Sequence, residues 1–238
     1  MGVPHGGIGG MPMTGSTDGS ALSLMVVTPG MTGIHDVFRR EFPLMSDLIR
    51  AVADGDAERA ALLAGHLRLV LDVVQVHHDA EEQFIWSRLP ERAPDARALV
   101  DTMLAQHAQV HALEATIRDQ LARWESSSDA TSGEALAEAV DAFTDALVAH
   151  AVQEEGEPLP IIVEHLTPAE WGEFVAYAST AMPEESRPTV MGMLMEDMPA
   201  PAREAFLGSL PEQLGTFLRT TGAEAYAGYV AAVRSVQH

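Results

Sequence analysis

The chain contains no cysteine among its 238 residues. Disulfides, thiolate zinc sites, iron–sulfur clusters and thiol nucleophiles are therefore excluded, and any bound metal must take histidine and carboxylate ligands. The absence of cysteine also agrees with a reducing cytoplasm, which is where we expect the protein to reside.

Basic residues are scarce as well. Lys and Arg total 14 against 35 Asp and Glu, which gives a formal net charge of -21. Such a charge repels nucleic-acid phosphates and anionic membrane surfaces. No apolar run approaches the roughly 20 residues of a membrane span, and the opening segment MGVPHGGIGGMPMTG lacks the basic and apolar regions of a secretory signal. We expect a soluble, cytoplasmic protein with no nucleic-acid or membrane partner.

Helical periodicity predicts four long helices. Apolar residues recur at intervals of three and four from Thr32 to about residue 52, although Pro43 is expected to kink or interrupt this helix. Further helices are predicted over about 56–89, 95–124 and 132–156, separated by polar or proline-containing segments. Long helices with short connections predict an all-α fold, an antiparallel up-down four-helix bundle.

Two further segments are expected to flank this bundle, which is assigned to residues 31–165. Residues 1–30 are rich in Gly, Pro, Ser and Thr and predict a flexible N-terminal arm. Residues 166–238 contain several proline or acidic helix starts, each followed by a short apolar run. They predict an additional C-terminal set of short helices packed on the bundle.

Three of the predicted helices each carry two potential metal ligands four residues apart, and such residues share one helix face. In antiparallel neighbours, these pairs and one upstream histidine fall toward the same end of the bundle. Burying carboxylates there costs several kcal/mol unless they are paired or coordinate a metal. We therefore expect an internal metal cluster with these candidate ligands: His35, His77, Glu81, His107, His111, His150 and Glu154.

The composition of this ligand set also indicates the metal. A mixture of imidazole and carboxylate without sulfur suits iron or manganese, and zinc is less expected in a site of five histidines and two carboxylates. Two metal ions bridged by the two glutamates, with the histidines as terminal ligands, would satisfy the buried charges. Two iron ions are the leading prediction, and manganese or zinc is less favoured.

Neighbouring polar residues are expected to take other roles. Glu82 and Glu155 each follow a ligand glutamate, and a rotation of about 100° turns them toward solvent or toward the outer side of the ligands. His78 and Asp79 are likewise expected beside the cluster rather than facing into it, with one of the two orienting a ligand imidazole. His66 lies about 16 Å along the helix from His77, too far to bind the same metals. The C-terminal tyrosines are expected to pack, with a role as ligand or radical trap left open for one of them.

The segments around the candidate ligands resemble those of the hemerythrin-like, or HHE cation-binding, proteins. The resemblance rests on IHDVFRRE, HHDAEEQFIW, QHAQVHALE and HAVQEEGEPLP in that order, and it covers about residues 30–165. The later LTPAEW and GMLMEDMP resemble an extension of bacterial members. The resemblance implies a non-haem di-iron centre that binds or responds to oxygen, nitric oxide, peroxide or iron. It implies His35, His77, Glu81, His107, His150 and Glu154 as ligands, and His111 matches a second histidine of the oxygen-carrying members.

Functions of different classes stay open. The first is a binding or sensing protein whose di-iron centre takes a small diatomic ligand or peroxide, with a role in oxidative stress. The alternative is a di-iron enzyme, either a catalase or peroxidase or an oxygenase whose substrate pocket the C-terminal helices close. Iron storage or a purely structural bundle is the third. The sequence does not decide between a monomer and a homodimer.

Overall fold

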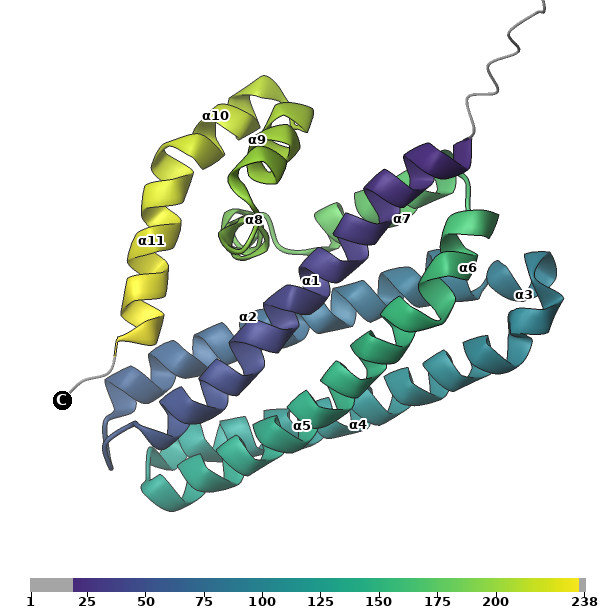
Figure 1. Ribbon diagram of the computed structural model, residues 1–238. Coiled ribbons are helices and arrows are strands. Elements are labelled where there is room, and N and C mark those ends of the chain that lie inside the picture. Colours follow the sequence, from purple (N-terminus) through teal and green to yellow (C-terminus); the bar gives the residue numbers. More distant parts are fainter. Residues whose placement is uncertain (1–18, 236–238) are drawn as a thin grey trace, which may run out of the picture.

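The computed structural model describes residues 19–235, which are mainly helical and contain no β-strand. Its four longest helices are α1 (Gly19–Arg50), α2 (Ala57–Glu81), α4 (Arg97–Ser127) and α5 (Ala130–Gly156). These helices lie side by side (Figure 1): α1 packs against α2 and α5, and α4 packs against the same two helices. The prediction of an all-α fold is confirmed.

Shorter helices link and extend these four. The link from α2 to α4 consists of the π-helical turn η1 (Glu82–Trp86), α3 (Leu89–Arg92) and the 3-10 turn η2 (Pro94–Ala96). After α5 come α6 (Pro158–His165), α7 (Pro168–Ala181), α8 (Arg187–Glu196), α9 (Ala200–Ser209), α10 (Glu212–Arg219) and α11 (Thr221–Arg234). In Figure 1, α9 and α10 stand away from the long helices, while α7 and α11 contact α2.

Helix α1 differs from the prediction in two places. Residues 19–30, expected in a flexible arm, are helical, because the run ALSLMVV contains strong helix formers. The rest of that arm, residues 1–18, lies outside the described residues. The helix also continues through Pro43 without interruption. Pro43 has no N–H to donate, but its neighbours Phe42 and Met45 are fully buried, and this packing keeps the helix intact.

Helix α2 ends earlier than predicted, and α5 begins earlier. The chain leaves the α-helical path at Glu81 and enters the π-helical turn η1 instead of continuing to Leu89. The wider turn allows the consecutive residues Ile85 and Trp86 both to be buried. Helix α5 begins two residues before Ser132, because the carboxylate of Asp129 accepts a hydrogen bond from the Ser132 N–H and caps the helix there.

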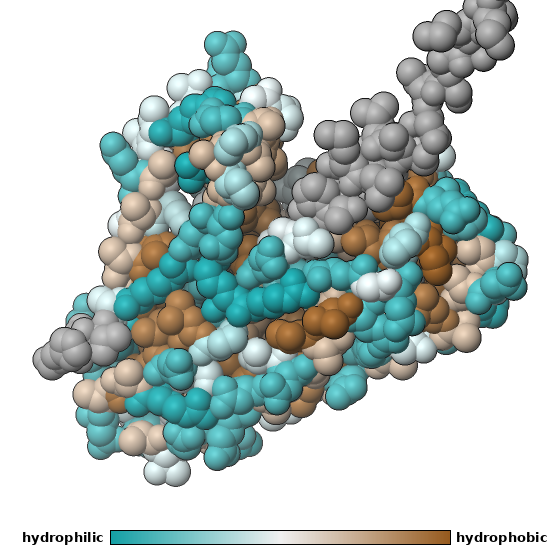
Figure 2. All heavy atoms as spheres, viewed as in Figure 1, coloured by the Kyte–Doolittle hydropathy of each residue, from teal (hydrophilic) through white to brown (hydrophobic). Residues whose placement is uncertain are grey.

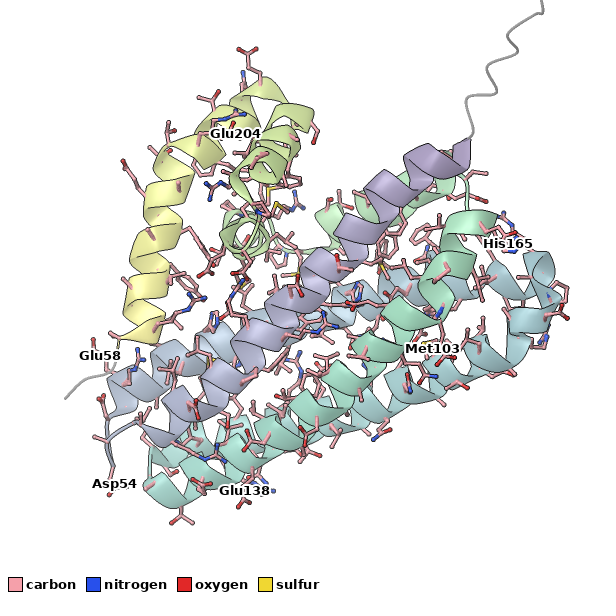
Figure 3. The ribbon with its side chains drawn as sticks, viewed as in Figure 1. Asp54, Glu58, Met103, Glu138, His165 and Glu204 are labelled. Carbon is pink, nitrogen blue, oxygen red and sulfur yellow. The ribbon has the colours of Figure 1, made fainter. Side chains whose placement is uncertain are left out.

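The apolar core has two main parts. One fills the space between the four long helices and includes Phe38, Trp124 and Phe143. The other surrounds η1, α6 and α7 and includes Trp86 and Trp171. On the outside, hydrophilic residues cover much of the face shown in Figure 2, with hydrophobic residues between them. The sticks of Figure 3 fill the interior between the long helices.

The segment Ala57–Arg92 corrects the expectation that no part of the chain could span a membrane. It is long and apolar enough by length and composition, with a mean hydropathy of 1.3 in its most apolar window. More than half of that window, 56%, is buried inside the protein, and the core helix of a soluble protein passes the same test. Here the apolar composition of the segment serves contacts with α1, α4 and α7.

A buried carboxylate joins α11 to the long helices. Glu41 of α1 is 1% exposed, and its Oε1 accepts hydrogen bonds from Arg40 at 2.8 Å and from Arg234 of α11 at 2.9 Å. Its Oε2 lies 3.1 Å from Nε2 of His66 on α2. Burial opposes the charged form, but the hydrogen bonds from His66 and Arg40 outweigh burial and lower the pKa of Glu41 to about 2. The carboxylate is therefore charged at neutral pH.

The lowered pKa of Glu41 predicts a pH-dependent stability. A carboxylate whose pKa is lower in the folded chain stabilises the fold above its ordinary pKa of 4.5, and this contribution is lost as the pH falls toward about 2. We expect Glu41→Gln to lower the free energy of unfolding at pH 7, and the deficit to shrink below pH 4.5. Denaturant titrations across this range measure it, with the exposed Glu58→Gln as control. A deficit that is independent of pH would contradict the prediction.

The contact between α8 and α11 depends on a glycine. A Cβ at Gly192 would lie 2.4 Å from Cγ and Cδ2 of the Tyr226 ring. We expect Gly192→Ala to separate the two helices and to destabilise the C-terminal part by about 1–3 kcal/mol. Gly228→Ala is the matched control, because nothing lies within 4 Å of a Cβ there. Hydrogen exchange of the α11 amides measures both variants, and unchanged protection in Gly192→Ala would refute the prediction.

Candidate metal centre

Six of the seven predicted ligands meet inside the protein. They come from all four long helices, and none is more than 5% exposed. These residues are His35 of α1, His77 and Glu81 of α2, His107 of α4, and His150 and Glu154 of α5. The spacing argument therefore identifies one shared site, because four segments that are distant in sequence bring their ligand atoms together.

The first group of ligand atoms is formed by His35, His77, Glu81 and Glu154, which offer one atom each within 4.8 Å of one another. Nε2 of His35 lies 3.1 Å from Nε2 of His77 and 3.3 Å from Oε2 of Glu154. Nε2 of His77 lies 3.0 Å from Oε1 of Glu81. Two imidazole nitrogens and two carboxylate oxygens thus surround one small space.

The second group is formed by His78, Glu81, His107 and His150, again with atoms within 4.8 Å of one another. Glu81 belongs to both groups. Its Oε1 faces His77, while its Oε2 lies 3.3 Å from Nε2 of His107. The position of this carboxylate is suited to bridge two cations.

His78 corrects the prediction that it lies beside the cluster. Its side chain is fully buried, and its ring stacks on that of His107 with centroids 4.0 Å apart and an interplanar angle of 11°. The rotation of 100° from His77 does not turn it outward, because α2 is covered by α4 as well as by α1. The spacing of three residues between His78 and Glu81, which also places two residues on one helix face, was the signal that could have found it.

His111 is the predicted ligand that the structure does not bring into either group. Its side chain is 29% exposed, and its Nδ1 lies 3.7 Å from Oε2 of Glu114. Its ring centroid is 5.6 Å from that of His78. His78 therefore occupies the place in the second group that the sequence had led us to expect for His111.

The donor atoms themselves show that the residues fit a metal. Several are buried without any hydrogen-bond partner, and a buried unsatisfied polar atom costs about 1–3 kcal/mol, more when it is charged. A bound cation satisfies such atoms together. They are both carboxylate oxygens of Glu81 and of Glu154, Nε2 of His107 and of His150, and both ring nitrogens of His78.

The pKa shifts of the ligand residues also indicate that the site suits a metal ion. Burial and the negative charge of Glu81 raise the pKa of Glu154, so Glu154 ionises less readily than an ordinary glutamate beside the charged Glu81. Burial also lowers the pKa of His150 to about 3 and that of His78 well below its ordinary value, with His107 adding to both effects. Neutral imidazoles keep a lone pair for a metal, and a cation between the carboxylates removes their repulsion.

Comparison with protein families agrees with this geometry. A family model described as the hemerythrin HHE cation binding domain matches residues 27–162, more than half of the chain. The chain belongs to this family. No curated protein and no solved structure gives a match. All the residues of the two ligand groups lie within the matched segment, whereas α7 to α11 lie beyond it.

The hemerythrin-like domain also fixes its ligand imidazoles from their outer side. Nδ1 of His35 lies 2.8 Å from Oε1 of Glu155, and Arg39 holds both oxygens of Glu155 at 3.0 Å. Nδ1 of His107 lies 3.0 Å from Oε1 of Glu82. Carboxylates that accept the Nδ1–H proton orient a ring and leave its Nε2 for the metal. The outer role predicted for Glu82 and Glu155 is confirmed.

A third outer contact was missed from the sequence. Nδ1 of His150 lies 3.1 Å from Oε1 of Gln106, whose side-chain amide donates to Oε1 of Gln153 at 2.8 Å. Gln106 directly precedes His107 on α4 and serves a histidine of α5. No spacing rule relates residues on two helices in this way, so no signal in the chain could have identified the pair.

Aromatic side chains enclose the centre. The Phe38 ring lies 5.6 Å from that of His77, and Phe174 of α7 lies 6.5 Å from the same ring. The Trp86 ring lies 6.4 Å from that of His107. These residues are buried and belong to the two apolar clusters, so the polar centre lies between them. By contrast, His165, for which no role was predicted, lies at the far end of α6 (Figure 3).

The arrangement predicts different metal contents for two histidine variants. We expect His78→Ala to weaken metal binding by the second group, which loses one of its three imidazole nitrogens, and so to retain less metal per chain than the wild type, while binding by the first group is unchanged. His111→Ala is the control and should retain the wild-type metal content. Elemental analysis of the purified proteins after metal loading measures both. Loss of metal in His111→Ala together with full retention in His78→Ala would reverse our assignment.

Proposed function

We propose that the protein holds two iron ions and uses them to bind or sense a small oxidant or diatomic ligand, such as oxygen, nitric oxide or peroxide. The observation that carries the proposal is the pair of buried ligand groups that share Glu81. The proposal takes α1, α2, α4 and α5 as an up-down antiparallel bundle. The mixture of imidazole and carboxylate donors without sulfur suits iron, and manganese or zinc is the less favoured alternative.

The two ligand groups differ in the number of protein donors. Glu154 belongs to the first group, but its Oε2 also lies 3.7 Å from Nε2 of His150 in the second. The second group therefore has access to three imidazoles and two carboxylates, while the first has two of each. This asymmetry favours an exogenous ligand on the side of His35 and His77. Iron held there supplies reversible ligand binding or electron transfer.

The protein's own residues support this function by orientation and exclusion of water. Glu155, Glu82 and Gln106 hold three of the imidazoles through Nδ1, so little rearrangement is needed when a ligand binds. Phe38 and Phe174 cover the first group with apolar rings. Such an enclosure favours a ligand of two or three non-hydrogen atoms over a larger organic substrate.

The position of α7 is also compatible with the alternative function, a di-iron enzyme. Phe174 reaches the centre from the C-terminal helices, as expected if those helices close a reaction site. A catalase or peroxidase reaction needs only a small substrate and is compatible with the enclosure. We also propose a cytoplasmic location and a role in oxidative stress. The acidic charge argues against a nucleic-acid or anionic membrane partner.

Metal analysis combined with stopped-flow spectroscopy tests the proposal. We expect about two iron ions per chain, and the reduced protein should change its absorption on mixing with oxygen, nitric oxide or peroxide. Glu81→Gln should lose most of the iron and the optical change, because it removes the shared carboxylate. Glu58→Gln, an exposed change on the same helix, should alter neither.

Three outcomes are informative here. Full iron binding by Glu81→Gln would argue against a shared carboxylate. A wild-type protein that binds iron without any optical response would contradict the binding function. Sustained peroxide decay faster than with free iron would favour the enzyme alternative.

A further inference from the structure

The contact between α11 and α2 contains a short chain of hydrogen-bonding groups away from the metal centre. Oη of Tyr229 lies 2.7 Å from Nδ1 of His66, and Nε2 of His66 lies 3.1 Å from Oε2 of Glu41. The tyrosine and histidine rings are tilted, with centroids 5.6 Å apart. Met193, Val230 and Val233 line the same place, and the packing there leaves no space for a water molecule.

We propose that Tyr229 is a redox-active tyrosine. It gives one electron to an iron ion that peroxide has oxidised, and its phenol proton passes to Nδ1 of His66 in the same step. The proposal rests on the proposed function, since the electron acceptor is the iron of that centre. It assigns to α11, which lies beyond the matched family segment, the task of donating electrons to the centre.

The step is balanced in atoms and charge. The O–H bond of Tyr229 breaks and an N–H bond forms at Nδ1 of His66, while one electron reduces the iron by one unit. Tyr229 becomes a neutral radical and His66 becomes an imidazolium. Before the step, His66 carries its proton on Nε2, because the charged carboxylate of Glu41 faces that nitrogen. After it, the same carboxylate stabilises the imidazolium.

The surroundings of Tyr229 favour this coupled transfer over loss of a proton alone. Burial and the charge of Glu41 raise the pKa of Tyr229 to about 12, so the phenol is protonated at rest. Loss of an electron without the proton would leave a cation in a partly buried site, which is costly. A base 2.7 Å from the phenol oxygen removes this cost, because the proton moves as the electron leaves.

The position of the pair also suits electron transfer to the centre. His66 and His77 lie eleven residues apart on α2, which corresponds to about 16 Å along the helix and to nearly the same face. Helix α1 lies beside both histidines, since its Glu41 contacts His66 and its His35 contacts His77. On that helix the buried rings of Phe38 and Phe42 have centroids 6.3 Å apart, and Phe38 lies 5.6 Å from His77. Electrons tunnel through protein over such distances, whereas the proton has to move only within its hydrogen bond.

Tyr226 provides a matched control three residues earlier on the same helix. It is also partly buried, and its hydroxyl donates to Oε2 of Glu196 at 2.7 Å. Its hydrogen-bond partner is a carboxylate whose pKa is lowered chiefly by a hydrogen bond from Arg234. Such a carboxylate is a much weaker proton acceptor than a neutral imidazole. The two tyrosines therefore differ mainly in the base beside the phenol.

Freeze-quench electron paramagnetic resonance of the iron-loaded protein mixed with hydrogen peroxide tests the proposal. We expect an organic radical whose signal narrows when the protein is made with ring-deuterated tyrosine. Tyr229→Phe should reduce the radical yield at least tenfold, and Tyr226→Phe should leave it nearly unchanged. His66→Gln should also reduce it strongly, since an amide accepts a hydrogen bond from the phenol but not its proton. Circular dichroism checks that each variant is folded.

The iron signal separates failure of this proposal from failure of the proposed function. If the protein binds no iron, both are overturned. If it binds iron but peroxide does not change the iron signal, the role of Tyr229 is overturned, and the proposed function is overturned as well only if oxygen and nitric oxide also leave the signal unchanged. If peroxide oxidises the iron but no tyrosine radical forms, only the role of Tyr229 is overturned. The same holds if the radical persists in Tyr229→Phe, as a radical on Trp86 would. A Tyr229→Phe protein with lowered stability and an unchanged radical would leave Tyr229 as a packing residue only.

Discussion

The burial of two carboxylates between four helices is the constraint on which the rest of the structure depends. Glu81 and Glu154 are almost completely removed from solvent, and the groups that contact them are imidazoles. Their oxygens have no hydrogen-bond partner among the described residues. Buried charges of this kind are stable only with a cation or proton between them. The outer hydrogen bonds orient the histidines toward these carboxylates, and the aromatic side chains enclose the resulting polar centre.

The sequence predicted most of this centre because its signal is local. Pairs four residues apart share a helix face, and four helices of similar length place such pairs at one level, so six of the seven candidate residues do meet inside the protein. The two difficult residues, His78 and His111, depend on which sides of a helix its neighbours cover. His78 is buried because α2 is covered on more than one side, whereas His111 lies on α4 near a partly open edge. Helical periodicity gives the angle between two residues on a helix. Which side of that helix is buried depends on tertiary packing.

Helix boundaries show the same limit. Pro43 is a local breaking signal, and tertiary contacts outweigh it because the surrounding side chains are buried. The π-helical turn after Glu81 has the opposite origin, since nothing in the local pattern interrupts the helix there. It brings the π-helical residue Glu82 against His107 and buries both Ile85 and Trp86, so its cause lies in the neighbouring elements. The contact of Glu41 with Arg234 joins residues 193 positions apart, and local sequence patterns do not predict it either.

A comparison of Glu41 with Glu81 shows how the protein compensates two buried carboxylates in different ways. Both Glu41 and Glu81 are almost fully buried, but the chain resolves their charges differently. Glu41 has two arginines as partners, and burial there requires nothing from outside the protein. Arginine neutralises Glu41, yet the described side chains that contact Glu81 are imidazoles. A neutral imidazole offers a lone pair where an arginine offers a charge. The imidazole nitrogens and carboxylate oxygens around Glu81 face one another with no arginine of the described residues between them. This arrangement therefore suits a metal ion bound from solution.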